Sequence, residues 1–306
     1  MRIEKILTGI NPAKSKGIEI GPLGNPAVTK DMGDIRYVDF STREELVKHY
    51  SKDPNVNTNN IPEIDYIWGE KTLREIVGSE EKFDYVIASH VIEHVPDLIG
   101  WLSEINEILA DNGVLSLVIP DKRCTFDILR NESTPAEMVH AYTSKSRKPT
   151  VQQMFDCFTN QVNVDLKGIW SGNVNPENLP KNHTPKAIYE VCLKTTKANS
   201  YFDTHCWVFT PHSFFKLLKV ASELNLFNYK IVHFYTTAKN KHEFYVTLQK
   251  IPSTVSAEEK LRIQIKSIPD VPNENIQDMD VEKNLISSKN FIKYLIYSIK
   301  NKFSNK

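Results

Sequence analysis

Short apolar runs alternate with stretches of helical periodicity along residues 17–119. This alternation is typical of βαβ units, in which helices connect parallel strands. In the helix expected after the fourth strand, the apolar positions between Leu98 and Leu109 fall on one face, and Asn112-Gly113 is a stop signal. We therefore expect a doubly wound α/β fold. The predicted strands are residues 17–21, 35–40, 64–68, 83–89 and 114–119.

The alternation is interrupted between residues 123 and 205. This stretch is rich in Pro, Asn, Thr and aromatic residues and is far longer than an ordinary connection, so it predicts an inserted lid or acceptor-binding subdomain. Thr210-Pro211 then opens a helix, and two strands follow at 229–234 and 243–249. The short polar link between those strands makes them antiparallel, because a parallel pair needs a crossover of about a dozen residues or more.

The C-terminal part of the chain has a different pattern. Residues 251–288 are polar and charged with little periodicity, which predicts a linker without a core of its own. Residues 289–306 place their apolar side chains on one face of a helix and their lysines on the other. Such a basic amphipathic helix lies on an anionic membrane surface or docks on a protein. Residues 1–250 are the expected catalytic domain.

Composition narrows the class of protein. The chain is 40% hydrophobic and 25% charged, as globular proteins are. Lysine plus arginine equals aspartate plus glutamate at 38 each, so no basic excess indicates a nucleic-acid partner. No apolar run is long enough for a secretion signal or a spanning helix, and the four cysteines are widely spread. We therefore expect a cytoplasmic protein with reduced thiols, with possible contact at the inner face of the membrane through residues 289–306.

The first predicted strand runs into a glycine turn, Gly21-Pro22-Leu23-Gly24. Glycine is needed where a ligand lies so close to the main chain that a Cβ would collide with it. The Gly-x-Gly-x-x-Gly spacing of nicotinamide-binding proteins is missing, and an acid, Glu19, stands two residues before the first glycine. Asp39 ends the second strand, where a carboxylate can accept from both hydroxyls of a ribose. The pattern favours S-adenosylmethionine (SAM) over a dinucleotide.

Four segments in order resemble the motifs of class I SAM-dependent methyltransferases, and they are closest to the type 11 and ubiquinone-methyltransferase-like branch. The segments are residues 19–24, 38–41, 83–97 and 112–115. Residues 120–123 and 207–211 further resemble a bacterial subgroup associated with surface-polysaccharide assembly. The resemblance covers most of residues 17–249 apart from the insert, and it implies a seven-stranded Rossmann-like sheet with an antiparallel last strand and a large insert between strands five and six.

The resemblance also implies which residues hold SAM. Glu19 would contact the amino-acid portion of SAM, and Asp39 would contact the ribose. The glycine turn would place its main chain against the backbone of the cofactor. The residues implied as cofactor contacts are Glu19, Gly21, Gly24, Asp39, Trp68, Glu70, Ser89, His90 and Glu93. One departure from the family pattern is that residues 22–34 contain Pro26 and Gly33, so the helix that normally follows the first strand is expected to be shortened or absent.

The segment from His90 to His94 also reads His-x-x-Glu-His, the spelling of an inverted zinc-protease motif. Protease chemistry is rejected because that motif belongs inside a helix, whereas this segment leaves a strand. Three alternatives stay open. His90 and Glu93 can contact substrate or cofactor, His90, Glu93 and His94 can share a divalent ion, or His94 can form structural hydrogen bonds. We assign no metal from the sequence.

Methyl transfer to oxygen needs orientation and a base for the hydroxyl proton. His90, Asp121 and His205 are the candidate catalytic residues, because they follow strands four and five or end the insert. The resulting hypothesis is a SAM-dependent O-methyltransferase of a sugar in surface-polysaccharide or glycolipid biosynthesis. The alternatives are a methyltransferase of a small metabolite and a non-catalytic SAM-binding subunit that scaffolds glycan enzymes.

Overall fold

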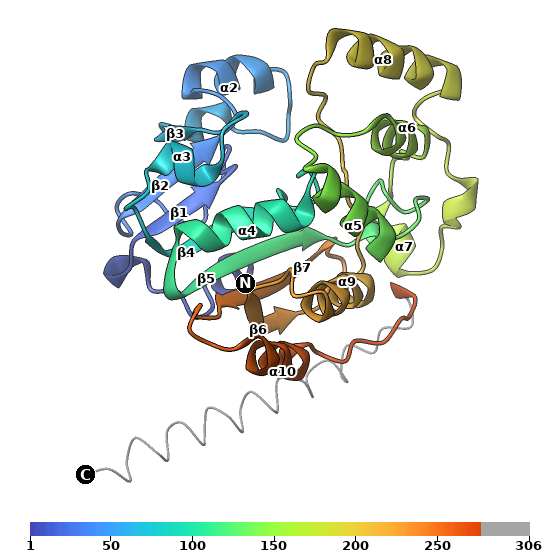
Figure 1. The fold of residues 1–306 in the computed structure, drawn as a ribbon. Helices are drawn as coiled ribbons and strands as arrows, with labels where there is room; N and C mark the ends of the chain where they lie inside the picture. Colours follow the sequence, from blue (N-terminus) through green and yellow to red (C-terminus); the bar gives the residue numbers. More distant parts are fainter. Residues whose placement is uncertain (277–306) are drawn as a thin grey trace.

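The computed structural model describes residues 1–276, which are built around one seven-stranded sheet (Figure 1). The strand order across the sheet is β3-β2-β1-β4-β5-β7-β6. Neighbouring strands from β3 to β5 are parallel, and β7 runs antiparallel to both β5 and β6. This topology confirms the doubly wound class and the antiparallel last strand. The strands are β1 (Gly17–Ile20), β2 (Ile35–Asp39), β3 (Tyr66–Ile67), β4 (Phe83–Ser89), β5 (Leu109–Pro120), β6 (Tyr229–Tyr235) and β7 (Glu243–Lys250).

Helices connect the strands and flank the sheet. The α-helices are α1 (Arg2–Ile6), α2 (Arg43–Tyr50), α3 (Leu73–Val77), α4 (Leu98–Ile108), α5 (Pro135–Ser144), α6 (Val151–Thr159), α7 (Leu166–Trp170), α8 (Pro185–Ala198), α9 (Pro211–Glu223) and α10 (Ala257–Ser267). Short 3₁₀ turns are η1 (Pro12–Lys14), η2 (Thr58–Asn60), η3 (Lys122–Cys124) and η4 (Pro176–Asn178).

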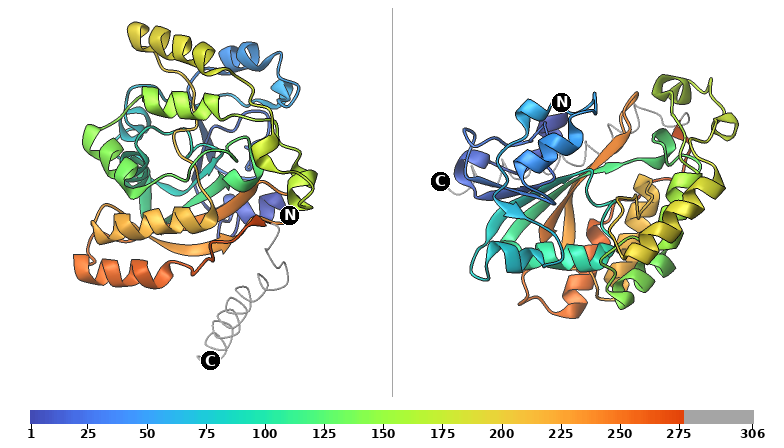
Figure 2. Two further views of the ribbon diagram at one scale, coloured as in Figure 1. Left: turned by 90° about the vertical axis from the view of Figure 1, so that its right-hand side faces the viewer. Right: turned by 90° about the horizontal axis from the view of Figure 1, so that it is seen from above.

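The two faces of the sheet are covered differently. Apolar side chains of α3, α4, α5 and α9 form the main core against one face, as Figures 1 and 2 show for α4 and α9. The other face packs against Ile6 of α1 and against Ala27 and Val28. Residues 22–34 form turns and bends with no helix, as the proline and glycine in this segment predicted. The glycine turn is therefore held by side-chain and loop contacts.

The insert of residues 123–205 is helical. It contains α5 to α8 and lies beyond the arrowhead end of β5 in Figure 1. α6 and α8 pack against each other through Met154, Ile188 and Cys192, which form a small core separate from the main one. The insert therefore projects over the carboxyl edge of the sheet, where the candidate site residues of β1, β2 and β4 end.

Residues 257–267 correct the prediction that residues 251–288 form a polar linker with little core of its own. They form α10, which packs on β6 and α9. Gln264 is fully buried and donates to Phe227 O, while Ser267 Oγ accepts from Ile231 N at 3.0 Å. The helix was missed because its contacts with the sheet are made largely by polar side chains, which leave only a weak apolar period in the sequence.

One local boundary also differs from the predictions. β5 begins at Leu109 directly after α4 rather than at residue 114, because Asn112 adopts a left-handed conformation (φ 62°) that lets the strand continue through the turn signal. This earlier start does not move the carboxyl end of the strand.

The basic amphipathic helix predicted for residues 289–306 lies outside the described residues. Among residues 1–276, no helix combines the length and the apolar character that crossing a membrane requires.

Candidate cofactor and acceptor site

The turn after β1 needs glycine at two positions for different reasons. Gly21 has φ +65°, a backbone conformation that residues with a side chain rarely adopt. Its N–H donates to Val38 O. At Gly24 the obstacle is the protein itself, because an added Cβ would lie 2.3 Å from Asn57 O. The turn is therefore fixed between β2 and the segment that carries η2.

Replacing Gly24 by alanine tests this packing. The new methyl group forces the turn away from the main chain of Asn57, and we expect a loss of roughly 1–3 kcal/mol in the free energy of unfolding. Gly69→Ala is the matched control, because no atom lies within 4 Å of its added Cβ. Urea denaturation followed by circular dichroism measures both variants. Equal stability of the two would show that the turn is not tightly packed.

Glu19 folds the same turn back onto β1. Its side chain is buried, and its carboxylate accepts from Ala27 N at 2.8 Å and from Val28 N at 3.2 Å. Burial outweighs these hydrogen bonds and raises the pKa of Glu19 to about 7. The structure thus gives Glu19 a role in shaping the turn, and its contact with the methionine portion of SAM stays a prediction.

Asp39 presents an unpaired carboxylate oxygen at the tip of β2. The side chain is 5% exposed, its Oδ1 accepts from Phe40 N at 2.8 Å, and its Oδ2 has no hydrogen-bond partner among residues 1–276. Burial raises the pKa of Asp39 to about 6. Trp68, whose N–H donates to Asp39 O at 2.8 Å, also has a buried indole N–H without an acceptor in the described part of the chain. A buried acceptor and a buried donor without protein partners fit a ribose and its base.

Ser89 and His90 belong to a charged network at the tips of β4 and β7. Arg2 donates to Ser89 Oγ at 2.6 Å and to Glu243 Oε1 at 2.9 Å. His90 Nε2 lies 2.8 Å from Glu243 Oε2, and Tyr245 donates to the same carboxylate. Burial alone would lower the pKa of His90, but the hydrogen bond with Glu243 and the nearby negative charge of Glu93 outweigh it and raise the pKa to about 9. His90 is therefore protonated at neutral pH and is poorly suited to accept a proton.

Glu93 lies fully buried among histidines. Neither of its carboxylate oxygens accepts a hydrogen bond from a described residue. His90 Nδ1 is 3.5 Å from Glu93 Oε1, which is too long for a well-formed hydrogen bond, and His94 Nε2 is 3.9 Å from it. Burial opposes the charge, yet the surrounding histidines hold the pKa of Glu93 below its usual value. Glu93, His94 and His205 each offer one possible ligand atom, a carboxylate oxygen or a ring nitrogen, and these three atoms lie within 4.8 Å of one another.

His205 reaches this cluster from the end of the insert. Its Nδ1 lies 2.6 Å from Asp127 Oδ2, and Asp127 in turn is paired with the buried Arg130 at 2.7 Å. Cys206 N and Trp207 N both donate to Glu93 O, which ties the end of the insert to the loop after β4. The structure thus brings together two predicted site residues, Glu93 and His205, from segments far apart in the sequence.

Tyr50 connects the two parts of the site. Burial, followed by the negative charges of Asp39 and Asp203, raises the pKa of Tyr50. Asp203 Oδ1 lies 2.8 Å from His94 Nδ1. The hydroxyl of Tyr50 is therefore influenced by one charge at the tip of β2 and by another at the edge of the histidine cluster. The predicted ribose contact and the cluster therefore belong to one neighbourhood at the carboxyl edge of the sheet.

Two predicted residues lie apart from this arrangement. Asp121 is fully buried, and its carboxylate accepts from Arg123 at 2.6 Å and from Thr237 Oγ1 at 2.6 Å. Both of these bonds go to Oδ2, and Arg123 Nε donates to Oδ1 at 2.9 Å, so neither carboxylate oxygen is left for an acceptor. Glu70 is exposed in the turn after β3. Their assigned roles stay predictions without geometric support.

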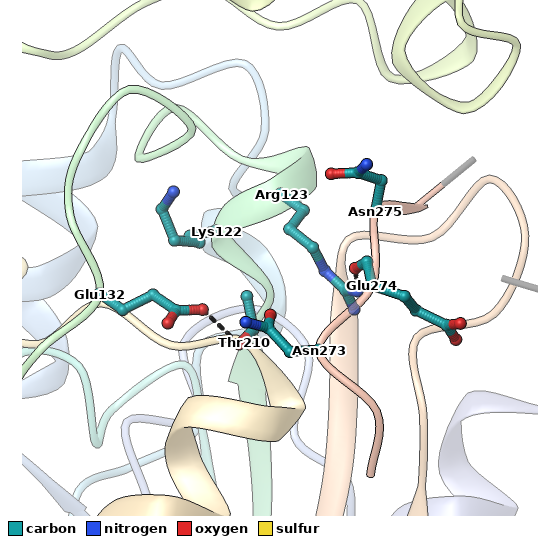
Figure 3. A pocket seen from close by; sticks show the side chains of 7 residues that line it. All are labelled: Lys122, Arg123, Glu132, Thr210, Asn273, Glu274 and Asn275. Atoms are coloured by element: carbon teal, nitrogen blue, oxygen red, sulfur yellow. Dashed lines mark hydrogen bonds between the residues drawn. The ribbon is translucent and has the colours of Figure 1, made fainter. Parts of the chain in front are cut away.

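A cavity of about 510 Å³ opens beside Asp121, between η3 and the start of α9 (Figure 3). Lys122, Arg123 and Glu132 line it, and Glu132 accepts from Thr210 Oγ1 at 2.6 Å. Both cations already have protein partners, since Lys122 Nζ donates to Ile128 O and Arg123 donates to Asp121 and to Glu274 O. The cavity is separate from the glycine turn, so we do not assign the cofactor to it.

Several residues that shape the site were not predicted. They are Arg2, Asp127, Asp203 and Glu243. Glu243 could have been found, because it is an acid at the start of a strand antiparallel to β5, which places it at the carboxyl edge of the sheet. Asp127 and Asp203 carry no such signal, since their positions depend on how the insert folds.

Comparison with known proteins gives one family match. The sequence model of a family described as a methyltransferase domain matches residues 10–222. The curated proteins contain no match.

Solved structures resemble this chain only distantly. The CcbJ methyltransferase from Streptomyces caelestis is 10% identical, over 82% of this chain and 94% of that one, with a TM-score of 0.41. The N-methyltransferase NodS from Bradyrhizobium japonicum, in complex with S-adenosyl-L-homocysteine (SAH), is 9% identical over 82% of this chain and 84% of that one, with a TM-score of 0.34. The CurJ carbon methyltransferase is 11% identical with a TM-score of 0.39, and this chain, covered to 80%, spans 51% of its length.

Proposed function

This chain belongs to the family of methyltransferase domains, and we propose on that premise that it transfers a methyl group from SAM to a hydroxyl group of a sugar. The observation that carries the proposal is the presence, at one edge of the sheet, of two features: a buried Asp39 carboxylate oxygen without a partner among residues 1–276, and a buried carboxylate and histidine cluster beyond the tip of β4, which is separated from β2 by β1. The first supports a nucleoside site, and the second supports a site where a hydroxyl loses its proton.

The cofactor residues follow from the edge of the sheet. Asp39 Oδ2 would accept from the ribose, Trp68 Nε1 would donate to the base or to the ribose, and the turn at Gly21 allows close approach of the ligand. SAM supplies, when bound, a methyl group made electrophilic by a positively charged sulfur. The protein's task is to hold that group in line with the acceptor oxygen and to exclude water.

The acceptor hydroxyl belongs at the cluster of Glu93, His94 and His205. As its oxygen forms a bond to the methyl carbon and the carbon–sulfur bond breaks, the hydroxyl proton has to leave. Among residues 1–276 neither Glu93 oxygen accepts a hydrogen bond, and His205 turns only its Nδ1 toward Asp127, so this cluster offers acceptors that the protonated His90 does not. These proton-accepting groups favour a hydroxyl acceptor over a carbon acceptor, because a carbon acceptor has no hydroxyl proton to lose.

A sugar is favoured by the surroundings of the cluster and by the sequence resemblance. Tyr201 is 51% exposed, and its hydroxyl donates to Asp203 Oδ1, which lies 2.8 Å from His94 Nδ1. An exposed aromatic ring beside a polar cluster suits the apolar face of a pyranose. The resemblance to a surface-polysaccharide subgroup and the basic pattern of residues 289–306 support an acceptor linked to a lipid at the inner membrane face.

An acceptor screen tests the proposal. The purified full chain is incubated with SAM labelled in its methyl group and with monosaccharides, nucleotide sugars and lipid-linked oligosaccharides. We expect SAH to form only with a sugar acceptor, whose mass increases by one CH2 unit, and the Asp39→Ala variant serves as the control with reduced turnover at SAM concentrations below saturation. Tight SAH binding with no turnover on any acceptor would instead favour a non-catalytic subunit, and turnover on an amine alone would contradict the hydroxyl assignment.

A further inference from the structure

Histidines and carboxylates gather in two clusters within residues 1–276. One contains His90, His242 and Glu243, and the other contains Glu93, His94 and His205. In the first cluster Glu243 is already bound to Arg2, His90 and Tyr245, and His242 is exposed. Its carboxylate has no oxygen left without a partner. The second cluster differs in this respect.

We propose that Glu93, His94 and His205 form a binding site for one divalent transition-metal ion. Glu93 is completely buried, and neither carboxylate oxygen accepts a hydrogen bond from the described residues. A buried carboxylate without hydrogen bonds is costly, and binding a metal ion is one of the few ways to offset that cost. His94 Nε2 is 3.9 Å from Glu93 Oε1, so an imidazole nitrogen already faces the same carboxylate.

The orientation of both histidines supports this site. His94 Nδ1 lies 2.8 Å from Asp203 Oδ1, and His205 Nδ1 lies 2.6 Å from Asp127 Oδ2. Each carboxylate fixes the proton on Nδ1, which leaves the Nε2 lone pair of each ring for a ligand. Histidines that bind metal ions in proteins nearly always donate their other nitrogen to a carboxylate, a carbonyl or water in this way.

The donor set selects the kind of ion. Two neutral imidazoles and one carboxylate suit Zn²⁺, Fe²⁺, Co²⁺ or Ni²⁺, whereas Ca²⁺ and Mg²⁺ prefer sites made of oxygen alone. The three ligand atoms lie within 4.8 Å of one another. Bonds of roughly 2.0–2.2 Å to the ion place such atoms about 3–4 Å apart, so small side-chain rotations complete the site. Cys206 N and Trp207 N both donate to Glu93 O, and these bonds hold the end of the insert against the loop after β4 while the side chains rotate.

This inference deepens the proposed function and rests on it for its chemical role. Three protein ligands would leave positions open on the ion for the acceptor hydroxyl, and a divalent ion would lower the pKa of that hydroxyl. With one Glu93 oxygen bound to the ion, the second Glu93 oxygen would remain to accept the hydroxyl proton. The metal alternative considered from the sequence grouped His90 with Glu93 and His94, whereas in the structure the third ligand is His205, about a hundred residues away in the chain. The insert has to fold before the site exists.

Metal analysis of the full chain, purified with any affinity tag removed, tests the site. The protein is stripped with a chelator and titrated with CoCl2 and ZnCl2 in the absence of SAM, and visible absorption and calorimetry are recorded. We expect one ion per chain, no detectable binding by Glu93→Gln and His205→Ala, and unchanged binding by His183→Ala, which removes an exposed histidine of the same insert. Asp203→Asn keeps all three ligands and alters a side chain that is 68% exposed, so folding is preserved, and we expect roughly 10- to 100-fold weaker binding.

Two results would overturn the metal site: no ion bound by the wild-type protein, or binding that survives His205→Ala and is lost in His242→Ala. The second result would place the ion in the other cluster. SAH titration of the stripped protein keeps the proposed function separate. If stripped protein binds SAH and methylates a sugar at the full rate, the ion has no role in methyl transfer and the proposed function stands without it. If the ion binds as described and no acceptor is methylated, the metal site stands and the proposed function is wrong.

Discussion

Asp39→Ala is expected to weaken SAH binding by roughly 10- to 150-fold. The substitution removes the acceptor of a ribose hydroxyl, and hydrogen bonds to a charged group contribute about 1.5–3 kcal/mol, at about 1.4 kcal/mol for each factor of ten. Isothermal titration calorimetry with SAH measures the loss. Asp111→Ala is the control, because Asp111 is exposed near the amino end of β5, at the opposite edge of the sheet. An affinity within twofold of wild type would remove Asp39 from the cofactor site.

The pH dependence of SAH binding gives a second measure of the same residue. Because burial raises the pKa of Asp39 to about 6, the carboxylate is charged at neutral pH and becomes protonated as the pH falls through about 6. The affinity for SAH should therefore decrease on acidification through that range. Glu19, whose pKa burial raises to about 7, titrates nearby, so the comparison is between wild type and Asp39→Asn. The difference between their two pH profiles isolates the contribution of Asp39.

The core of the fold was predictable because its signals are local. Each apolar run between residues 17 and 119 ends where a parallel strand ends, so the pattern alone placed Asp39 and Ser89 at one edge of the sheet. The missing helix in residues 22–34 was likewise predicted by proline and glycine. These features depend on residues within one or two turns of the chain, which is the range that periodicity describes.

The hydrogen-bond partners of the predicted site residues could not be predicted from the local sequence pattern. Glu19 was predicted to contact a ligand, and the structure shows its carboxylate bound to Ala27 N and Val28 N. Asp121 was a candidate base, and the structure pairs it with Arg123 and Thr237. In both cases the residue type and its place at a strand end were informative, but the hydrogen bonds depend on how a loop returns to it.

The insert shows the same limit over a longer distance. His205 was named as a candidate because it ends the insert, yet its orientation comes from Asp127, which lies 78 positions earlier in the chain. No spacing rule connects them, since α5 to α8 intervene. The buried pair of Asp127 and Arg130 therefore decides whether His205 faces the site at all, and this dependence leads to a stability prediction.

Arg130→Met is expected to lower the free energy of unfolding by about 3–5 kcal/mol, the usual cost of leaving one partner of a buried ion pair uncompensated. Arg130 and Asp127 side chains are each 3% exposed and lie 2.7 Å apart, and Arg130 also binds Asp156 at 2.8 Å. Urea denaturation in the presence of a chelator measures the loss without any contribution from a bound ion. Arg262→Met is the control and should be neutral, because its ion pair with Glu259 is exposed to solvent.

A double variant separates the buried charge from the packing of the side chain. Asp127→Asn with Arg130→Met removes both charges, so we expect it to recover part of the stability that Arg130→Met loses. His205 would still lose its orienting carboxylate in the double variant, and methyl transfer should stay impaired even where folding is restored. A stable Arg130→Met protein, within about 0.5 kcal/mol of wild type, would mean that His205 alone compensates Asp127. The orientation of His205 would then not depend on Arg130, because the contact between His205 and Asp127 would be sufficient to hold both side chains.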